Sequence, residues 1–525
     1  MRTKNSTKME ARIKYPIGIQ SFEKLRNAGQ CYVDKTALMY ELVSNEGYYF
    51  LSRPRRFGKS LLVSTLKAYF EGKRELFKGL AIEQLETEWN TYPVLHLDLN
   101  AKQYREENDL LKILNMHLER WESLYGDEFR DRDVDERFTH VIEKAYQKTG
   151  KKVVILVDEY DKPLALNLTN DELSDQYRSI LKAFYGVMKS SDEYIRMGFL
   201  TGVTKFSKVS VFSDLNNLDD ISMWSKYTSI CGITEQEIHD YFDSEVESLG
   251  AENGMTKEEC YAKLRRRYDG YHFRENSPGI YNPFSLIHTL NKREFGNYWF
   301  SSGTPTLLVD LLKQLEYNLN NLESEPVTPE LLGSADTIRR NPLPVLYQSG
   351  YLTIKSYDER FGEYHLGFPN EEVESGFINF LLPMYTNAQR EDTTFSISRF
   401  VRDVERGDIE SFMTRLESFM SDTDYRVVGK AELYVQNVLF ILFRLLGFYV
   451  EVEHATSNGR TDMVIKTKDN IYIFELKVDR SADEALQQIE DKGYARPYAA
   501  DSRPVTKIGI SFSSEKRCIQ EWKAI

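Results

Sequence analysis

The sequence is poor in cysteine and lacks the features that define several classes of protein. The cysteines are scattered without a CxxC pair, which argues against a disulfide framework or a zinc site and suits a reducing cytoplasm. The most apolar run, 438–450, is 13 residues long and contains Arg444, so it is too short and too charged to cross a bilayer. No apolar stretch follows the polar first ten residues, and we expect no signal peptide. These absences predict a cytoplasmic protein without a membrane segment. The four cysteines are Cys31, Cys231, Cys260 and Cys518.

Basic residues are also fewer than acidic residues. The chain has 68 lysine and arginine residues against 81 aspartate and glutamate residues, which gives a formal net charge of −13. This balance excludes a small basic nucleic-acid-binding domain. A local groove can still be positive, and any DNA contact there should be salt-sensitive. Arginines cluster at 53–56, 265–267 and 339–340, and the last two clusters are better explained as solvated surface charge.

The composition is otherwise that of a folded protein. Hydrophobic residues make up 41% of the chain and aromatic residues 13%, which is too apolar for a disordered protein. A length of 525 residues predicts about three domains. No repeat, low-complexity tract or Gly/Ser-rich or Pro-rich linker interrupts the chain. From the motifs below, we place the domains at 1–232, 233–395 and 396–525.

The segment around residue 55 predicts a phosphate-binding loop. An apolar strand (YYFLS, 48–52) precedes RPRRFGKS (53–60), and apolar residues then recur at helical spacing. Such a loop needs backbone N–H groups around phosphate oxygens, a lysine on the β/γ-phosphates and a hydroxyl on Mg²⁺. The segment matches only the second half of GxxxxGK[ST], because an arginine replaces the first glycine and a proline without an N–H follows it. The candidate nucleotide contacts are Arg53, Arg55, Arg56, Phe57, Gly58, Lys59, Ser60 and Leu61.

A second motif predicts the metal-binding side of the nucleotide site. VVILV (153–157) is a continuous β-branched run, typical of a buried parallel strand, and it ends in Asp158 and Glu159. We predict that Asp158 and Ser60 hold Mg²⁺ and that Glu159 polarises the attacking water. The alternative for the two acids alone is a solvated strand end, which the order and spacing of the motifs disfavour.

Two further strands are predicted in the same region. PVLHLDL (93–99) lies between the two motifs, and IRMGFLT (195–201) follows them. The second strand ends in Thr201, a polar residue that we predict could sense the γ-phosphate.

Several strings in this half of the chain resemble the bacterial AAA-ATPase-like family, which is related to the signal-transducing and archaeal-type ATPases. The resemblance covers nearly the whole chain and implies a P-loop core with a parallel sheet that binds ATP. In that family RPRRFGK replaces the glycine-rich loop, so Arg53 looks like the family's normal residue. Association of copies through the ATPase domain stays open. The strings are YPIGIQSFEKLR with YVDKT (15–36), SRPRRFGKSLL (52–62), ILVDEYDKPL (155–164) and FLTGVTKFSKVSVFSDLNNLDDIS (199–222).

The region 233–395 is predicted to be a helical, winged-helix-like segment. Thr234 and Glu237 have the spacing of a capping box at the start of a helix. Small strands are expected within 347–354 and 366–373. The segment is either a lid that moves with nucleotide or passive packing, and the sequence leaves both open. Its family-like strings are YDGYHF (268–273), IYNPFSLI (280–287) and YWFSSGTPTLL (298–308).

Near the C-terminus, a hairpin predicts a pair of facing carboxylates. TDMVIKT (461–467) and IYIFELKV (471–478) are typical of strands joined by a tight turn. If Thr467 pairs with Asn470, Asp462 lies opposite Glu475, and Lys477 shares the face of Glu475 because side chains alternate along a strand. A shift of one residue would put Asp462 on the wrong face.

Helices on both sides of the hairpin supply two more candidates. Ser481 and Glu484 form a second capping box, and Gln488 then lies on the packed side of the helix. Glu432 lies in a helix upstream of the hairpin.

This set resembles the signature of the PD-(D/E)XK nucleases, carried by GRTDMVI (459–465), IFELKVD (473–479) and EALQQIEDKGYARPY (484–498). Thr461 replaces the proline that the family carries before the aspartate. The residue types suit Mg²⁺ or Mn²⁺, held by Asp462 and Glu475. Lys477 would orient or deprotonate the water, and Glu432 and Gln488 would orient metal, water or backbone.

Three functional hypotheses follow from this α/β, multi-domain interpretation. In the first, ATP binding gates a DNA-cutting domain, as in defence or mobile-element enzymes. In the second, the protein is a nucleotide-switched regulatory or interaction protein whose nuclease activity is weak or lost. In the third, the C-terminal site acts on RNA or binds nucleic acid without cutting it. We favour the first, with DNA as the substrate.

Overall fold

The computed structural model divides into two compact units. Unit 1 comprises Met1–Ser302 and Pro326–Glu371, and unit 2 comprises Gly303–Glu325 and Glu372–Ile525. The region predicted as one domain, 233–395, is therefore shared between the two units. The structure describes residues 13–168, 170–206, 211–212, 215, 217–302, 306–333, 340–385, 390–421, 431–456, 461–516 and 518–525.

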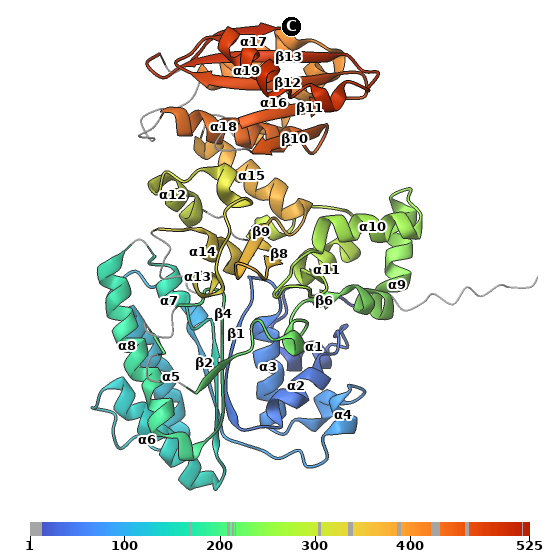
Figure 1. The fold of residues 1–525 in the computed structure, drawn as a ribbon. Helices are drawn as coiled ribbons and strands as arrows, with labels where there is room; N and C mark the ends of the chain where they lie inside the picture. Colours follow the sequence, from blue (N-terminus) through green and yellow to red (C-terminus); the bar gives the residue numbers. More distant parts are fainter. Residues whose placement is uncertain are drawn as a thin grey trace, which may run out of the picture. The chain divides into compact units, whose positions relative to one another are not determined.

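Unit 1 is built around a parallel five-stranded sheet, as the sequence predicted (Figure 1). The strand order is β2-β3-β4-β1-β5, so β4 lies between the strand that leads into the phosphate loop and the strand that ends in the two acids. Every residue of β3 is buried, which explains its unbroken apolar run. The strands are β1 (Gly47–Ser52), β2 (Val94–Asp98), β3 (Val153–Asp158), β4 (Ile195–Gly202) and β5 (Leu218–Asp220).

Helices cover both faces of this sheet. Figure 1 shows α5, α6 and α8 gathered on one face and α1 to α4 on the other. They are α1 (Phe22–Asn27), α2 (Thr36–Val43), α3 (Lys59–Phe70), α4 (Ile82–Leu85), α5 (Asp109–Tyr125), α6 (Val134–Thr149), α7 (Lys162–Ala165) and α8 (Asp171–Ser190).

Three helices with their own apolar core follow the sheet. They are α9 (Glu235–Glu252), α10 (Lys257–Tyr268) and α11 (Pro283–Lys292), joined by the short pair β6 (Ile233–Thr234) and β7 (Ile280–Tyr281). We call α9 to α11 the lid helices, as a label for their place after the sheet that implies no movement. The predicted capping box is confirmed, since Thr234 accepts from the Glu237 N–H and Glu237 from the Thr234 N–H. Tyr15 near the N-terminus packs into the lid core, so the first segment of the chain belongs partly to the lid.

The rest of unit 1 is a small helix-and-hairpin module. The strand expected within 347–354 begins only at Thr353, because Tyr347 and Gln348 end α14 and residues 349–352 form a turn. Likewise β9 ends at Gly367, and most of 366–373 is not strand. The elements are α13 (Pro329–Leu332), α14 (Leu343–Gln348), β8 (Thr353–Asp358) and β9 (Glu363–Gly367).

Unit 2 contains a mixed five-stranded sheet in the order β10-β11-β12-β13-β14, with β12 and β13 parallel and the other pairs antiparallel. The strands are β10 (Glu451–Thr456), β11 (Thr461–Lys466), β12 (Ile471–Val478), β13 (Val505–Ser513) and β14 (Cys518–Ala524). The helices are α12 (Thr306–Gln314), α15 (Glu371–Tyr385), α16 (Arg390–Arg406), α17 (Ile409–Ser421), α18 (Ala431–Leu446) and α19 (Ala482–Lys492).

Both faces of the second sheet are covered. On one face Phe474 contacts Phe412 of α17 and Phe443 of α18. On the other, Ile473 packs with Ile489 of α19. The face that carries Glu475 and Lys477 is therefore the one under α19.

Among the described residues, no helix is both long and apolar enough to cross a membrane.

Candidate functional sites

The phosphate loop connects β1 directly to the N-terminus of α3. Gly58, the residue before the helix, has the left-handed φ of 95° that favours glycine, and Arg56 also has a positive φ of 71°. Lys59 is 4% exposed, and its Nζ donates to the carbonyl oxygens of Arg53 (3.1 Å) and Pro54 (3.3 Å). The same Nζ lies 3.6 Å from Glu159 Oε1. The lysine therefore contacts the loop and the acid that follows β3.

Arg53 occupies the position of the missing glycine. Its side chain is buried and supports the backbone of the loop. Its guanidinium donates to the carbonyl oxygens of Ser222 (2.8 Å) and Tyr227 (3.0 Å) and lies 4.0 Å from the centre of the Phe273 ring. These contacts use the guanidinium for structure, so the predicted phosphate contact is more naturally assigned to the exposed Arg55 and Arg56. We expect Arg53 to hold the backbone that its neighbours present.

Phe57 is a second loop residue with a packing role. It is buried, and its ring makes edge contacts with the rings of Tyr271 and Phe273. Arg56 stacks over Phe284 at the start of α11, with 4.7 Å between its guanidinium carbon and the ring centre. The loop is thereby joined to the segment between α10 and α11.

Asp158 and Ser60 fit the predicted metal site. Burial raises the pKa of Asp158 to about 6, and a hydrogen bond with Ser60 opposes that shift. Its Oδ1 is buried and has no hydrogen-bond partner among the described residues. A buried carboxylate oxygen beside a hydroxyl is a ligand set that suits Mg²⁺. Glu159, the next residue, has a left-handed φ of 55°, a strained backbone of the kind that clusters at functional sites.

The structure uses Thr201 differently from the prediction. Its side chain is fully buried, and its hydroxyl donates to the carbonyl oxygen of Leu51 at 3.0 Å, which ties β4 to β1. The Thr201 hydroxyl, which was predicted to sense the γ-phosphate, is therefore engaged in a hydrogen bond within the sheet.

Sequence reasoning missed Tyr160 and Asp161, which hold the segment after β4. Asp161 accepts from the N–H of Val203 (3.2 Å) and of Thr204 (2.6 Å), and Tyr160 donates to the Thr204 carbonyl oxygen at 2.9 Å. Burial raises the pKa of Asp161 to about 6. The only signal in the sequence was the DEYDKP string, in which the last aspartate had no assigned role.

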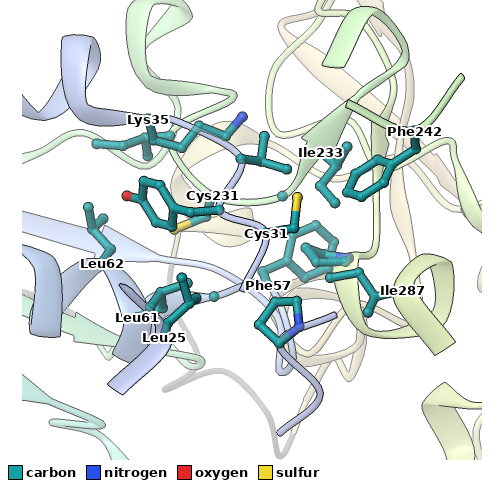
Figure 2. Close-up of a pocket in the computed structure, with 17 residues that line it drawn as sticks. Leu25, Cys31, Lys35, Phe57, Leu61, Leu62, Cys231, Ile233, Phe242 and Ile287 are labelled. Atoms are coloured by element: carbon teal, nitrogen blue, oxygen red, sulfur yellow. The ribbon is translucent and has the colours of Figure 1, made fainter. Parts of the chain in front are cut away.

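A cavity of about 100 Å³ adjoins the loop (Figure 2). Its walls come from the N-terminal segment, from α3, from 230–233 and from the lid helices, and they are almost wholly apolar. Lys35 is the only charged residue among those that line it. The lining residues are Pro16, Leu25, Cys31, Tyr32, Val33, Lys35, Phe57, Gly58, Leu61, Leu62, Ile230, Cys231, Gly232, Ile233, Phe242, Pro283 and Ile287.

In unit 2, the side chains of Glu475, Lys477 and Gln488 meet beneath α19. Lys477 Nζ donates to Glu475 Oε1 at 2.7 Å and to Gln488 Oε1 at 2.5 Å. Glu475 is 2% exposed, so its carboxylate is held in a protected position beside a cation. Strand alternation places the first two residues, and the capped start of α19 fixes the rotation that brings Gln488 to them.

The hairpin register predicted from its turn is confirmed. The Thr467 N–H donates to the Asn470 carbonyl oxygen at 2.8 Å, and Asp462 is the direct partner of Glu475. Directly opposite residues of an antiparallel pair have their Cβ atoms about 5 Å apart, which suits two ligands of one divalent ion. The side chains of Asp462 and of Glu432 lie outside the described part of the structure.

Comparison with known proteins supports a two-module assignment. A family model described as "Predicted AAA-ATPase" matches residues 16–212, and one described as "PD-(D/E)XK nuclease superfamily" matches residues 430–522. The chain belongs to the AAA-ATPase-like proteins that carry a C-terminal PD-(D/E)XK nuclease-superfamily domain. It is 37% identical over 521 residues to an uncharacterized protein from the vnfD 5' region of Azotobacter chroococcum mcd 1, with 97% of this chain and 98% of that protein covered.

A solved structure, the Aeropyrum pernix ORC2 protein in ADPNP and ADP complexes, was also matched. It is 13% identical, with a TM-score of 0.24 over 71% of this chain and 96% of that one. A likeness at this level bears on no functional argument.

Proposed function

We propose that the protein is an ATP-binding ATPase coupled to a Mg²⁺-dependent nuclease that acts on DNA. The observation that carries the proposal is the double convergence of catalytic groups. Lys59 lies beside Glu159 in unit 1, and Lys477 joins Glu475 to Gln488 in unit 2. Lys59 and Glu159 come from elements 100 positions apart in the chain, and Lys477 joins its own strand β12 to the helix α19 that packs on it.

In unit 1, the loop N–H groups and Lys59 would bind the β- and γ-phosphates, with Arg55 and Arg56 adding positive charge. Ser60 and Asp158 would hold Mg²⁺, which neutralises phosphate charge when bound. Glu159 would orient and polarise the attacking water. The base would occupy the apolar cavity next to the loop, where its flat rings replace water against apolar walls.

In unit 2, Asp462 and Glu475 would hold the divalent ion, which lowers the pKa of water and stabilises charge on phosphate when bound. Lys477 would orient or deprotonate the attacking water, and Gln488 holds the Lys477 ammonium in place through its amide oxygen. DNA is preferred to RNA because of the nuclease superfamily to which the domain belongs.

One observation favours a second candidate, a nucleotide-switched regulatory protein with weak or absent cleavage. In the structure Lys59 contacts two carbonyl oxygens of its own loop and the Glu159 carboxylate. Phosphate binding would replace these contacts and release Glu159, which is how a switch would report nucleotide. The two candidates differ only in whether unit 2 cuts.

The two activities can be separated with two variants of the full chain. ATP hydrolysis and cleavage of linear, circular and single-stranded DNA and of RNA are measured with Mg²⁺ or Mn²⁺. Lys59→Ala should weaken ATP binding strongly and abolish ATP hydrolysis because it removes the main cation for the phosphates. Lys477→Ala should lower cleavage about 10²- to 10⁴-fold and leave ATP hydrolysis intact. Each variant is thus the folding control for the other.

Unchanged ATP turnover in Lys59→Ala would refute the ATPase assignment. Cleavage that persists in Lys477→Ala would refute the nuclease site. If the wild-type protein hydrolyses ATP but cuts no substrate under any condition, the regulatory candidate replaces the nuclease.

A further inference from the structure

The YVDKT segment (Tyr32–Thr36) contains a lysine that the fold itself does not explain. Its neighbours have structural roles: Asp34 Oδ1 accepts from the Thr36 N–H at 2.8 Å, and Asp34 Oδ2 accepts from the Ala81 N–H at 2.7 Å. These bonds start α2 and attach it to α4. Between them stands Lys35, whose side chain enters the wall of the cavity beside the phosphate loop.

Lys35 is buried, and burial of an ammonium is costly unless its donors are used. It is 8% exposed, and its Nζ lies 2.5 Å from Glu237 Oε1 at the start of α9. Burial lowers the pKa of Lys35, and Glu237 opposes that effect. An ammonium has three N–H donors. Within the described residues, the Lys35 ammonium donates one hydrogen bond, to Glu237.

Glu237 does not need Lys35 to stay in place. Its second oxygen, Oε2, accepts from the Thr234 N–H at 2.8 Å as part of the capping box that starts α9. The carboxylate is therefore already held by the helix terminus without Lys35.

The residues that line the cavity indicate which groups of a ligand the remaining Lys35 N–H donors would contact. Figure 2 shows Lys35 among apolar side chains and the thiols of Cys31 and Cys231. Such walls bury the faces of a flat ring without distinguishing its edges, and a lysine donor can pair only with an acceptor on such an edge.

We propose that Lys35 is a specificity-determining residue that donates a hydrogen bond to a ring-nitrogen or carbonyl acceptor on the edge of a nucleotide base held in this cavity. The inference rests on the proposed nucleotide binding by unit 1, and it adds a base-reading contact separate from the phosphate loop. Affinity for ATP then has a part that depends on the base through Lys35 and a part that depends on the phosphates through Lys59.

Calorimetric titration of the full chain with Mg²⁺ and either ATP or inorganic tripolyphosphate separates the two parts. Lys35→Met keeps the length and apolar stem of the side chain without its donors. It should weaken ATP binding about 10- to 100-fold, the range for a hydrogen bond to a charged group, and leave tripolyphosphate binding within about twofold. Lys59→Ala should weaken both ligands.

Two further variants make the result specific to the base contact. Glu237→Gln removes the ion pair but keeps the Lys35 donors and a side chain that can complete the capping box. It should retain most of the ATP affinity. Lys35→Arg keeps the charge but puts a larger group in the cavity, and should weaken ATP without weakening tripolyphosphate.

The inference is overturned if Lys35→Met binds ATP like the wild-type protein, if it loses both ligands equally, or if Glu237→Gln loses as much ATP affinity as Lys35→Met. Failure of the underlying function looks different. In that case the wild-type protein binds neither ligand, or Lys59→Ala binds both normally.

Discussion

Arg53 shows how a single residue can change a phosphate loop without removing it. A glycine at this position normally allows the backbone to approach phosphate. Here the position is occupied by an arginine, whose side chain makes contacts within the protein instead. Its donors reach carbonyl groups of Ser222 and Tyr227, about 170 positions away in the chain. The loop geometry is held by this brace, while Gly58 keeps the positive φ that begins α3.

Asp269 in the lid region provides a test of how burial of one carboxylate affects stability. Burial raises its pKa from an ordinary 3.8 to about 6, with Glu235 adding to the shift. Between pH 3.8 and about pH 6, the Asp269 carboxyl is therefore mostly protonated in the folded state and mostly charged in the unfolded chain. Its charged form costs stability above pH 6, by at most about 3 kcal/mol, and this cost disappears as the pH falls toward 4.

We therefore expect Asp269→Asn to melt at a higher temperature than the wild-type protein at pH 8, by about 2–4 °C for each kcal/mol recovered. The difference should shrink as the pH is lowered from 6 to 4. Thermal melts between pH 8 and pH 4 check the prediction, with Asp240→Asn on the exposed side of α9 as a matched surface control. A constant or growing difference toward low pH would contradict it.

The places of the candidate site residues in the fold were predicted more accurately than the contacts that position them. Lys59, Asp158, Glu475 and Lys477 follow from local order, because a strand end or a two-residue strand period places each of them. The Arg53 contacts and the Thr201 bond to Leu51 depend on partners that are distant in the chain. A single sequence does not show which distant carbonyl oxygen will lie within reach.

At the scale of elements, the sequence predicted β1 to β4, the β11–β12 hairpin with its register and the capped starts of α9 and α19. It did not predict β5, β6, β7, β10, β13 and β14. Tyr347 was expected in a strand and lies in α14, since Pro342 and Pro344 at the helix start favour a helical first turn there. The hairpin register succeeded because Asp469 and Asn470 N–H groups both donate to the Thr467 hydroxyl and define the turn.

The packing of α19 on β13 provides an element-scale prediction. Gly509 lets the helix come close, because a Cβ built there would lie 2.4 Å from the backbone oxygen of Ala482. Gly509→Ala should push α19 away from the sheet and destabilise unit 2 by about 1–3 kcal/mol. It should also reduce cleavage, since α19 carries Gln488.

Limited proteolysis and thermal melts can check this prediction against Thr506→Ala, a half-buried change in the same strand that adds no atom. Gly509→Ala should make unit 2 clearly more sensitive to protease than Thr506→Ala does. Equal stability of the two variants would show that the close approach of α19 is not required.

At the scale of the whole molecule, the chain order hides the division into units. The segment Gly303–Glu325 belongs to unit 2, although residues of unit 1 flank it in sequence. Its attachment is polar and specific: Asn437 of α18 accepts from the Leu319 N–H at 2.8 Å and donates to the Tyr317 carbonyl oxygen at 2.9 Å. The boundaries drawn at 232 and 395 from motifs therefore differ from the limits of the structural units.

The chain crosses between the units three times, so a change in one unit has several covalent routes to the other. We propose that nucleotide bound at residues 53–60 controls cleavage at Glu475 and Lys477. Coupling free energies between protein sites are typically 1–3 kcal/mol, so an effect of the order of tenfold is expected.

The most direct test measures the initial rate of DNA cleavage with saturating Mg²⁺, with and without ATP, in the wild-type protein and in Lys59→Ala. Our account predicts that ATP changes the wild-type rate by roughly tenfold and leaves the Lys59→Ala rate unchanged. A wild-type cleavage rate that is the same with and without ATP, and equal to the rate of Lys59→Ala, would contradict it.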